Sequence, residues 1–167
     1  TLHRAHASTA GVPALVADKA AGHLVRREVE ALGGLLRKPE RPFVAILGGA
    51  KVSDKIAVFD NLMPRVDAFL VGGAMAYTFL AARGLPVGDS RVEREKIWQA
   101  RRIMERAVER DVALHLPVDH VVSTEIDGSA EGQTHEAIPD GTKGVALGPA
   151  PVPRFAAVPA GARPVFW

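Results

Sequence analysis

Residues 42–55 constrain the fold more than any other segment, because an apolar stretch there runs directly into a glycine pair. Residues 43–47 are apolar or favour strands, and this unbroken run predicts a strand buried on both faces, as in a parallel sheet. Gly48 and Gly49 then allow a sharp backbone turn and leave space for a ligand. The segment after them, residues 52–63, is expected to form a helix.

Two lysines next to the glycine pair make this junction a candidate phosphate site. Lys51 and Lys55 are four residues apart, so on a helix their ammonium groups reach the same side. Backbone N–H groups at the helix start and the positive end of the helix dipole also favour an anion. No Gly-Lys-Ser/Thr sequence follows the glycines, so the segment is not the common P-loop. Positive charge around phosphate oxygens is the main requirement of phosphoryl transfer.

Composition limits the classes of protein that remain. The 167 residues, with 47% hydrophobic and 24% charged side chains, fit one soluble globular domain or a piece of one. The 21 basic residues nearly balance 19 acidic ones, which argues against nucleic acid and anionic membranes as partners. The absence of cysteine excludes disulfides, thiolate metal sites and a cysteine nucleophile. Without a long apolar run or a signal peptide, we expect a cytoplasmic protein.

Both ends of the sequence look truncated. The chain opens without an initiator methionine, and it closes on the apolar run 164–167, whereas natural termini are more often polar and frayed. We therefore expect a piece of a longer protein. The alternative, a processed or compact whole protein, stays open.

Strands and helices alternate along the chain. Pro39 and Pro42 end a first amphipathic helix, and residues 124–143 are polar and glycine-rich, which is typical of a surface excursion. Helices are expected over residues 18–37, 52–63, 74–83, 91–110 and 151–158, and strands over 43–47, 68–71, 112–116, 120–123, 145–149 and 163–167. This alternation predicts an α/β fold of three layers with a mainly parallel, Rossmann-like sheet.

Ligands of such sheets bind at the carboxyl ends of the strands. Three of these ends carry glycines, namely Gly48, Gly49, Gly72, Gly73 and Gly148. Together they predict a shallow floor of bare backbone that suits a nucleobase or a phosphate chain. A single glycine pair is more often just a tight turn, so the functional interpretation depends on the neighbouring lysines.

A second candidate anion site lies near the amino end. Arg4 offers a planar fork to a phosphate or carboxylate, and His3 and His6 could donate hydrogen bonds to the same group. A plain surface segment is the alternative, and a metal site there lacks further ligands. Asp119 is a candidate base or metal ligand, although an aspartate at a strand end more often caps the chain.

Six ordered motifs resemble those of phosphoglycerate kinases. They are HRAHAS at residues 3–8, RPFVAILGGAKVSDKI at 41–56, VGGAMAYTFL at 71–80, LPVD at 116–119, IPDG at 138–141 and LGP at 147–149. The resemblance spans essentially the whole chain. It implies a central section of a two-lobed kinase that transfers a phosphoryl group from 1,3-bisphosphoglycerate to magnesium-bound ADP in glycolysis, giving 3-phosphoglycerate and ATP.

The resemblance also implies a domain organisation. Residues 1–18 would end the amino-terminal, phosphoglycerate lobe and start the interlobe helix, which residues 19–38 continue. Residues 39–167 would form most of the carboxyl-terminal, nucleotide-binding lobe. The complete protein is expected to be a monomer.

Site residues follow from the matched motifs. Lys51 is similar to the lysine that stabilises the transferring phosphoryl group, Lys55 to the lysine on the nucleotide phosphates, and Arg4 to the last basic residue that holds phosphoglycerate. The nucleotide pocket would be lined by Gly48, Gly49, Ala50, Gly72, Gly73, Leu147 and Gly148. The magnesium ligand, an aspartate in a later glycine-rich turn of the family, is expected outside this chain.

The sequence departs from the family at Ala74, where a third glycine is common, and around Ala146, where the motif is altered. With the opposing substrate lobe and the magnesium ligand absent, we expect the isolated chain to have no turnover, because alignment and electrostatics supply most of the catalysis. A non-catalytic nucleotide-binding module of the same fold remains an alternative. A dinucleotide-dependent oxidoreductase is disfavoured, because residues 48–51 do not supply Gly-x-Gly-x-x-Gly.

Overall fold

The computed structural model describes residues 5–37, 39–126 and 132–167. Internal contacts divide the chain into two compact units, Thr1–Lys38 and Pro39–Trp167. None of the helices in these described ranges combines the length and apolar character that crossing a membrane requires.

The first unit is helical. A short π-helix, η1 (Ala7–Gly11), continues into α1 (Val12–Leu15), and the backbone N–H of Ser8 donates to the His6 ring at the start of η1. Helix α2 spans His23–Arg37, so it begins five residues later than the sequence pattern predicts. Gly22 immediately precedes it, and glycine is a poor helix former.

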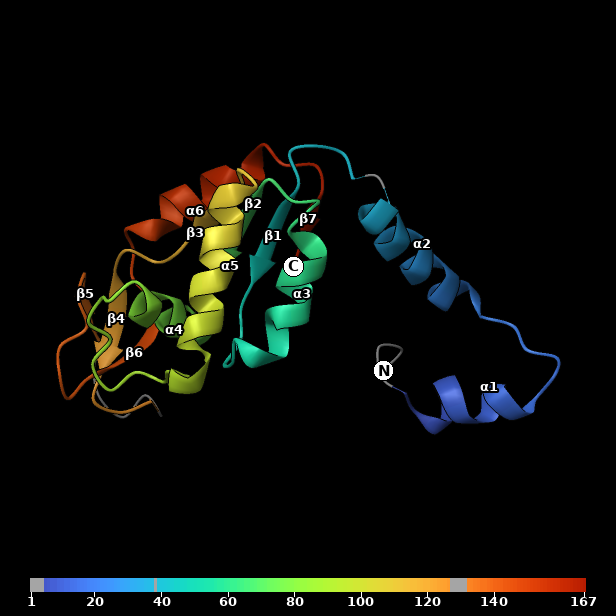
Figure 1. The fold of residues 1–167 in the computed structure, drawn as a ribbon, viewed down its shortest axis with the longest axis horizontal. Helices are drawn as coiled ribbons and strands as arrows, with labels where there is room; N and C mark the ends of the chain where they lie inside the picture. Colours follow the sequence, from blue (N-terminus) through green and yellow to red (C-terminus); the bar gives the residue numbers. More distant parts are fainter. Residues whose placement is uncertain (1–4, 38, 127–131) are drawn as a thin grey trace. The chain divides into compact units, whose positions relative to one another are not determined.

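A four-stranded parallel sheet forms the centre of the second unit (Figure 1). Its order is β3–β2–β1–β7, with β1 at Val44–Leu47, β2 at Ala68–Val71, β3 at Ala113–His115 and β7 at Val165–Phe166. Val44 in β1 pairs with Ala68 on one side and Val165 on the other. The predicted parallel sheet is confirmed.

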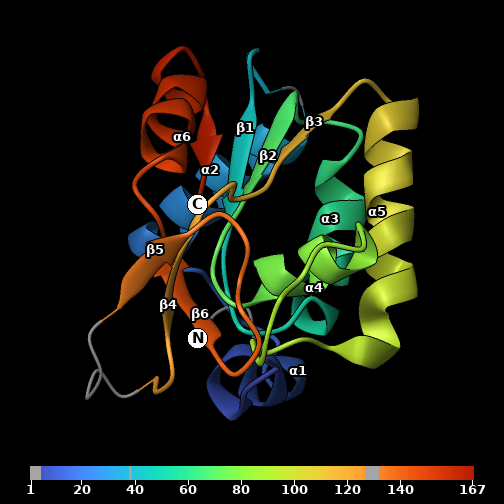
Figure 2. The ribbon, with the colours of Figure 1, turned by 90° about the vertical axis from the view of Figure 1, so that its left-hand side faces the viewer.

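Helices cover both faces of this sheet (Figure 2). Helices α3 (Ile56–Leu62), α4 (Met75–Ala82) and α5 (Ile97–Glu109) lie on one face, and α6 (Pro151–Ala160) lies on the other. The predicted three-layer α/β fold is therefore confirmed. Two helices start later than expected, because the 3₁₀ turns η2 (Ser53–Lys55) and η3 (Arg94–Lys96) precede α3 and α5.

The core explains the unbroken apolar runs of the central strands. On the three-helix face, Phe59 packs against Phe69 and Phe79 with ring centroids 5.0 and 5.5 Å apart, and all three rings are buried. On the α6 face, Val44 and Leu70 pack with other apolar side chains, among them Phe155 and Val158 of α6. Strands covered on both faces have no position for a polar residue.

A second sheet was not predicted. Strands β5 (Gln133–His135), β4 (His120–Ser123) and β6 (Lys143–Leu147) pair in that order, and both pairings are antiparallel. The sequence pattern indicated β4 and β6 but treated residues 124–143 as a surface excursion, although β5 and the start of β6 lie within it. Pro117 separates β3 from β4, and a proline cannot donate to a strand ladder, so the chain leaves the parallel sheet there.

Candidate functional site

The glycine turns after β1 and β2 lie directly against each other. Gly73 has φ +67°, and a Cβ atom there would lie 2.9 Å from both the nitrogen and the oxygen of Gly49. The N–H of Met75 donates to the Gly49 carbonyl at 2.9 Å, and the N–H of Gly72 donates to the Leu47 carbonyl at the same distance. Two predicted site residues, Gly49 and Gly73, are thus in direct backbone contact, and a side chain at position 73 would prevent this contact.

The end of β6 supplies a wall beside this floor. The Leu147 Cδ1 atom lies 4.0 Å from the position of a Cβ at Gly72, so the predicted Leu147 and Gly72 are neighbours. Gly148 is instead buried against Asp119, because a Cβ at Gly148 would lie 2.3 Å from the Asp119 Cγ. The N–H of Ala150 donates to Asp119 Oδ2 at 3.0 Å, so Asp119 caps the turn that leads into α6.

A cavity of about 190 Å³ opens between the start of α4 and β6. Its lining includes Gly73, Ala74, Tyr77, Lys143 and Leu147. Pockets that enclose whole small molecules measure roughly 300–1,000 Å³, so this cavity suits one ring system with the rest of a ligand outside. Gly73 and Leu147 had been predicted to line such a pocket, and they do line this one.

The spacing of Lys51 and Lys55 predicts that both lie on one α-helix, but in the structure they do not. Lys51 lies in the exposed turn before η2, whereas Lys55 ends η2 immediately before α3. The Lys55 Cε atom is 3.9 Å from the position of a Cβ at Gly49, so this side chain extends over the first glycine turn. Gly48 and Ala50 are exposed in the same turn.

The segment after the first glycine turn, where the sequence predicts that a phosphate binds, is occupied by the carboxylate of Glu93. The N–H of Ser53 donates to Glu93 Oε2 at 3.1 Å, and the Ser53 hydroxyl donates to Oε1 at 2.7 Å. Burial raises the pKa of Glu93, but hydrogen bonds from Ser53 and from the Val52 N–H, together with the charge of Lys51, outweigh burial and hold the pKa below its ordinary value of 4.5. Glu93 is therefore an ionised cap on this segment.

Sequence reasoning missed several residues around the site. Glu93 was placed within a helix over 91–110, but it lies in the loop before η3. Tyr77 was not singled out, although it lines the cavity and packs so closely on Gly144 that a Cβ there would lie 2.3 Å from its ring. A glycine within a strand marks such a close approach, so Gly144 was the available signal.

Arg4, the predicted phosphoglycerate contact, lies outside the described residues, as does His3. Within the described ranges, no group of three or more histidine or acidic side chains could hold a metal ion. The site as described therefore consists of glycine backbone, an apolar wall and lysines.

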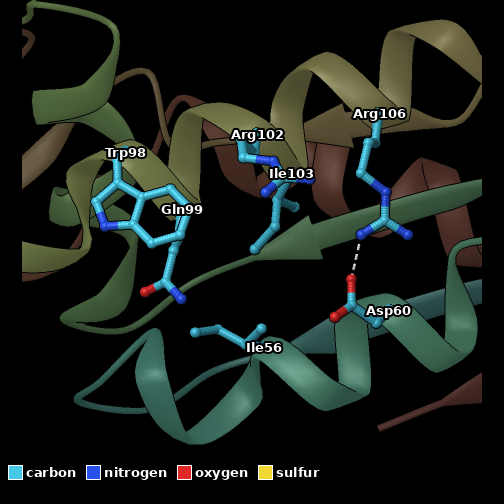
Figure 3. A pocket seen from close by; sticks show the side chains of 7 residues that line it. All are labelled: Ile56, Asp60, Trp98, Gln99, Arg102, Ile103 and Arg106. Carbon is cyan, nitrogen blue, oxygen red and sulfur yellow. Dashed lines mark hydrogen bonds and ion pairs between the residues drawn. The ribbon is translucent and has the colours of Figure 1, made fainter.

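A second hollow of about 160 Å³ lies between α3 and α5 (Figure 3). An ion pair between Asp60 and Arg106 closes one end of it, and the exposed Trp98 lies at the other. None of the predicted site residues lines this hollow.

Comparisons with known proteins identify the family of this chain. The family model for phosphoglycerate kinase matches residues 1–167. The phosphoglycerate kinase of Anaeromyxobacter dehalogenans strain 2CP-C is 57% identical over 169 residues, which cover 100% of this chain and 43% of that protein. That of Bdellovibrio bacteriovorus is 46% identical, over 99% of this chain and 42% of that protein.

A solved structure of the phosphoglycerate kinase from Coxiella burnetii superimposes with a TM-score of 0.87 at 40% identity, covering 98% of this chain and 42% of that one. The chain thus spans less than half the length of the relatives that it matches. With a family model that matches from the first residue to the last, the chain belongs to the phosphoglycerate kinase family.

Proposed function

We propose that this chain carries the nucleotide half of a phosphoglycerate kinase. The complete protein would transfer a phosphoryl group reversibly between 1,3-bisphosphoglycerate and ADP in glycolysis, as a cytoplasmic monomer. The observation that carries the proposal is the packing of Gly73 on Gly49 beside a cavity lined by Gly73 and Leu147, in a chain of this family. Residues 39–167 would be the nucleotide lobe, with residues 19–38 as the interlobe helix and 1–18 as the end of the phosphoglycerate lobe.

In this proposal the base occupies the cavity beside Tyr77 and Leu147, and the phosphates extend over the first glycine turn toward Lys55. An oxygen of the terminal phosphate of ADP attacks the phosphorus of the acyl phosphate. The bond from that phosphorus to the carboxyl oxygen breaks, and 3-phosphoglycerate leaves as a carboxylate. Lys51 stabilises the charge on the transferring group, and Arg4 holds the phosphoglycerate.

Magnesium would arrive bound to the nucleotide phosphates. The resemblance to the family implies that its protein ligand, an aspartate in a later glycine-rich turn, lies outside this chain; the described residues include no group of three or more histidine or acidic side chains that could hold the ion.

The proposal is tested by assaying binding and turnover separately on the 167-residue chain. We expect calorimetry to detect binding of magnesium-ADP and a coupled assay to detect no turnover, because the charges that align the acyl phosphate are missing. Appreciable turnover would contradict the inactivity, and the absence of binding would contradict the site. The alternative, a non-catalytic nucleotide module, predicts that the longer protein containing these residues also binds nucleotide without turnover.

A further inference from the structure

Glu93 contacts the lysine-bearing segment with both oxygens of its carboxylate. One accepts from the Ser53 N–H at 3.1 Å and the other from the Ser53 hydroxyl at 2.7 Å, across 40 positions of sequence. Hydrogen bonds to an ionised group are shorter and stronger than those between neutral groups. Two of them on one residue fix the backbone of Ser53, which lies between Lys51 and Lys55.

Glu93 is itself held by the other half of the site. Its N–H donates to the Thr78 hydroxyl at 3.1 Å, and Thr78 is buried in α4, the helix that follows Gly73. Glu93 therefore connects the segment after the first glycine turn to the helix after the second.

The charge of Glu93 has a consequence for phosphate. The Ser53 N–H, which could otherwise donate to a phosphate oxygen at this helix start, already donates to the Glu93 carboxylate, and Lys51 interacts electrostatically with the same carboxylate. The ammonium groups, rather than the helix start, are thus left to contact phosphate. From these contacts we infer that Glu93 is a positioning residue for nucleotide phosphates, acting through Ser53 on the two lysines; this rests on the proposed function.

The test separates phosphate recognition from base recognition in the 167-residue chain. Magnesium-ADP and adenosine are titrated into the wild type, E93Q, E93A and the control E95Q, which removes the same charge from an exposed position two residues away. We expect E93A to weaken ADP binding by about tenfold, since a hydrogen bond to a charged group contributes that much, and to leave adenosine binding unchanged. E93Q, which keeps one acceptor oxygen, should lie between, and E95Q should match the wild type.

Equal losses of ADP and adenosine affinity in E93A would show that Glu93 stabilises the structure in general and does not act on phosphate binding specifically, which would overturn the inference. An unchanged ADP affinity in E93A would overturn it as well, while leaving the proposed function intact. If the wild type binds neither ligand, the proposed function fails and the inference fails with it.

Hydrogen exchange of the Ser53 amide checks the contact without any ligand. We expect this amide to be protected in the wild type and E95Q, and to exchange about tenfold faster in E93A, because its acceptor is gone. If the Ser53 amide is protected in the wild type but ADP does not bind, the proposed function is wrong. If the Ser53 amide is unprotected in the wild type, the contact between Glu93 and Ser53 is wrong.

Discussion

Gly73 lies against Gly49 so closely that a Cβ atom at Gly73 would be 2.9 Å from the nitrogen and the oxygen of Gly49. Neither of these backbone atoms can move aside as a flexible side chain would. The contact joins the turns after β1 and β2 into one floor, and it explains why a side chain is excluded there.

We predict that Gly73→Ala destabilises the chain more than Gly84→Ala. Both glycines have positive φ, +67° and +78°, so both substitutions incur left-handed backbone strain of roughly 1–2 kcal/mol. No described atom lies within 4 Å of a Cβ at Gly84, whereas Gly73→Ala adds a backbone clash worth about 1–3 kcal/mol more. Urea unfolding measures the difference, and equal losses in the two variants would contradict the close contact.

Lys51→Ala and Lys55→Ala should each weaken the binding of magnesium-ADP by roughly 10- to 100-fold, the contribution of a hydrogen bond between charged groups. Adenosine binding should be unaffected, because neither lysine lines the cavity. Lys96→Ala in η3 is the matched control and should bind both ligands as the wild type does. Calorimetry with the two ligands checks this. An equal loss of adenosine binding in the lysine variants would contradict the claim that the lysines bind the phosphates and not the base.

Asp119→Ala should cost about 1–3 kcal/mol of stability, because it leaves the Ala150 N–H without its acceptor beneath the turn at Gly148. Asp119→Asn keeps an oxygen in place and should lose less. The exposed Asp140→Asn serves as the control for a lost charge. Denaturant melts of the three variants give the order, and an Asp119→Ala variant as stable as the wild type would show that the carboxylate does not hold this turn.

Stability should fall as the pH is lowered below 6.5, in part through His120. Burial lowers the pKa of His120, and the charge of Asp119 only partly opposes this, so the folded protein resists protonation at a pH where the unfolded chain accepts a proton. The loss begins near the ordinary value of 6.5 and continues until the pH passes the lower folded pKa. His120→Gln should flatten the change in melting temperature between pH 7.5 and 5.5, and an undiminished slope would assign the effect to other groups.

The buried strands and the glycine turns could be predicted because their signals are local. Residues 43–47 and 68–71 are unbroken apolar runs that end in glycine pairs, and the structure places strands and close-packed turns there. The contact between Gly49 and Gly73 follows from the pairing of β1 with β2, because the carboxyl ends of neighbouring parallel strands meet at one edge of a sheet.

The interactions that organise the site could not be predicted in this way. Glu93 reaches Ser53 across 40 residues, and nothing near it distinguishes it from a charged residue on a helix surface. Strand β5 contains no apolar alternation that would separate it from a loop, because it is a mostly exposed edge strand of a small sheet. Long-range polar contacts and short edge strands leave no periodic pattern in a sequence.

Thermal unfolding of the 167-residue chain with and without magnesium-ADP tests the central claim, that these residues form a nucleotide site, most directly. At about 100 times the dissociation constant, a ligand that binds only the folded state adds about 2.7 kcal/mol and raises the melting temperature by roughly 5–10 °C. We predict such a rise for the wild type and its loss in the Lys51→Ala/Lys55→Ala double variant. An unchanged wild-type melting temperature at saturating ligand would contradict the site.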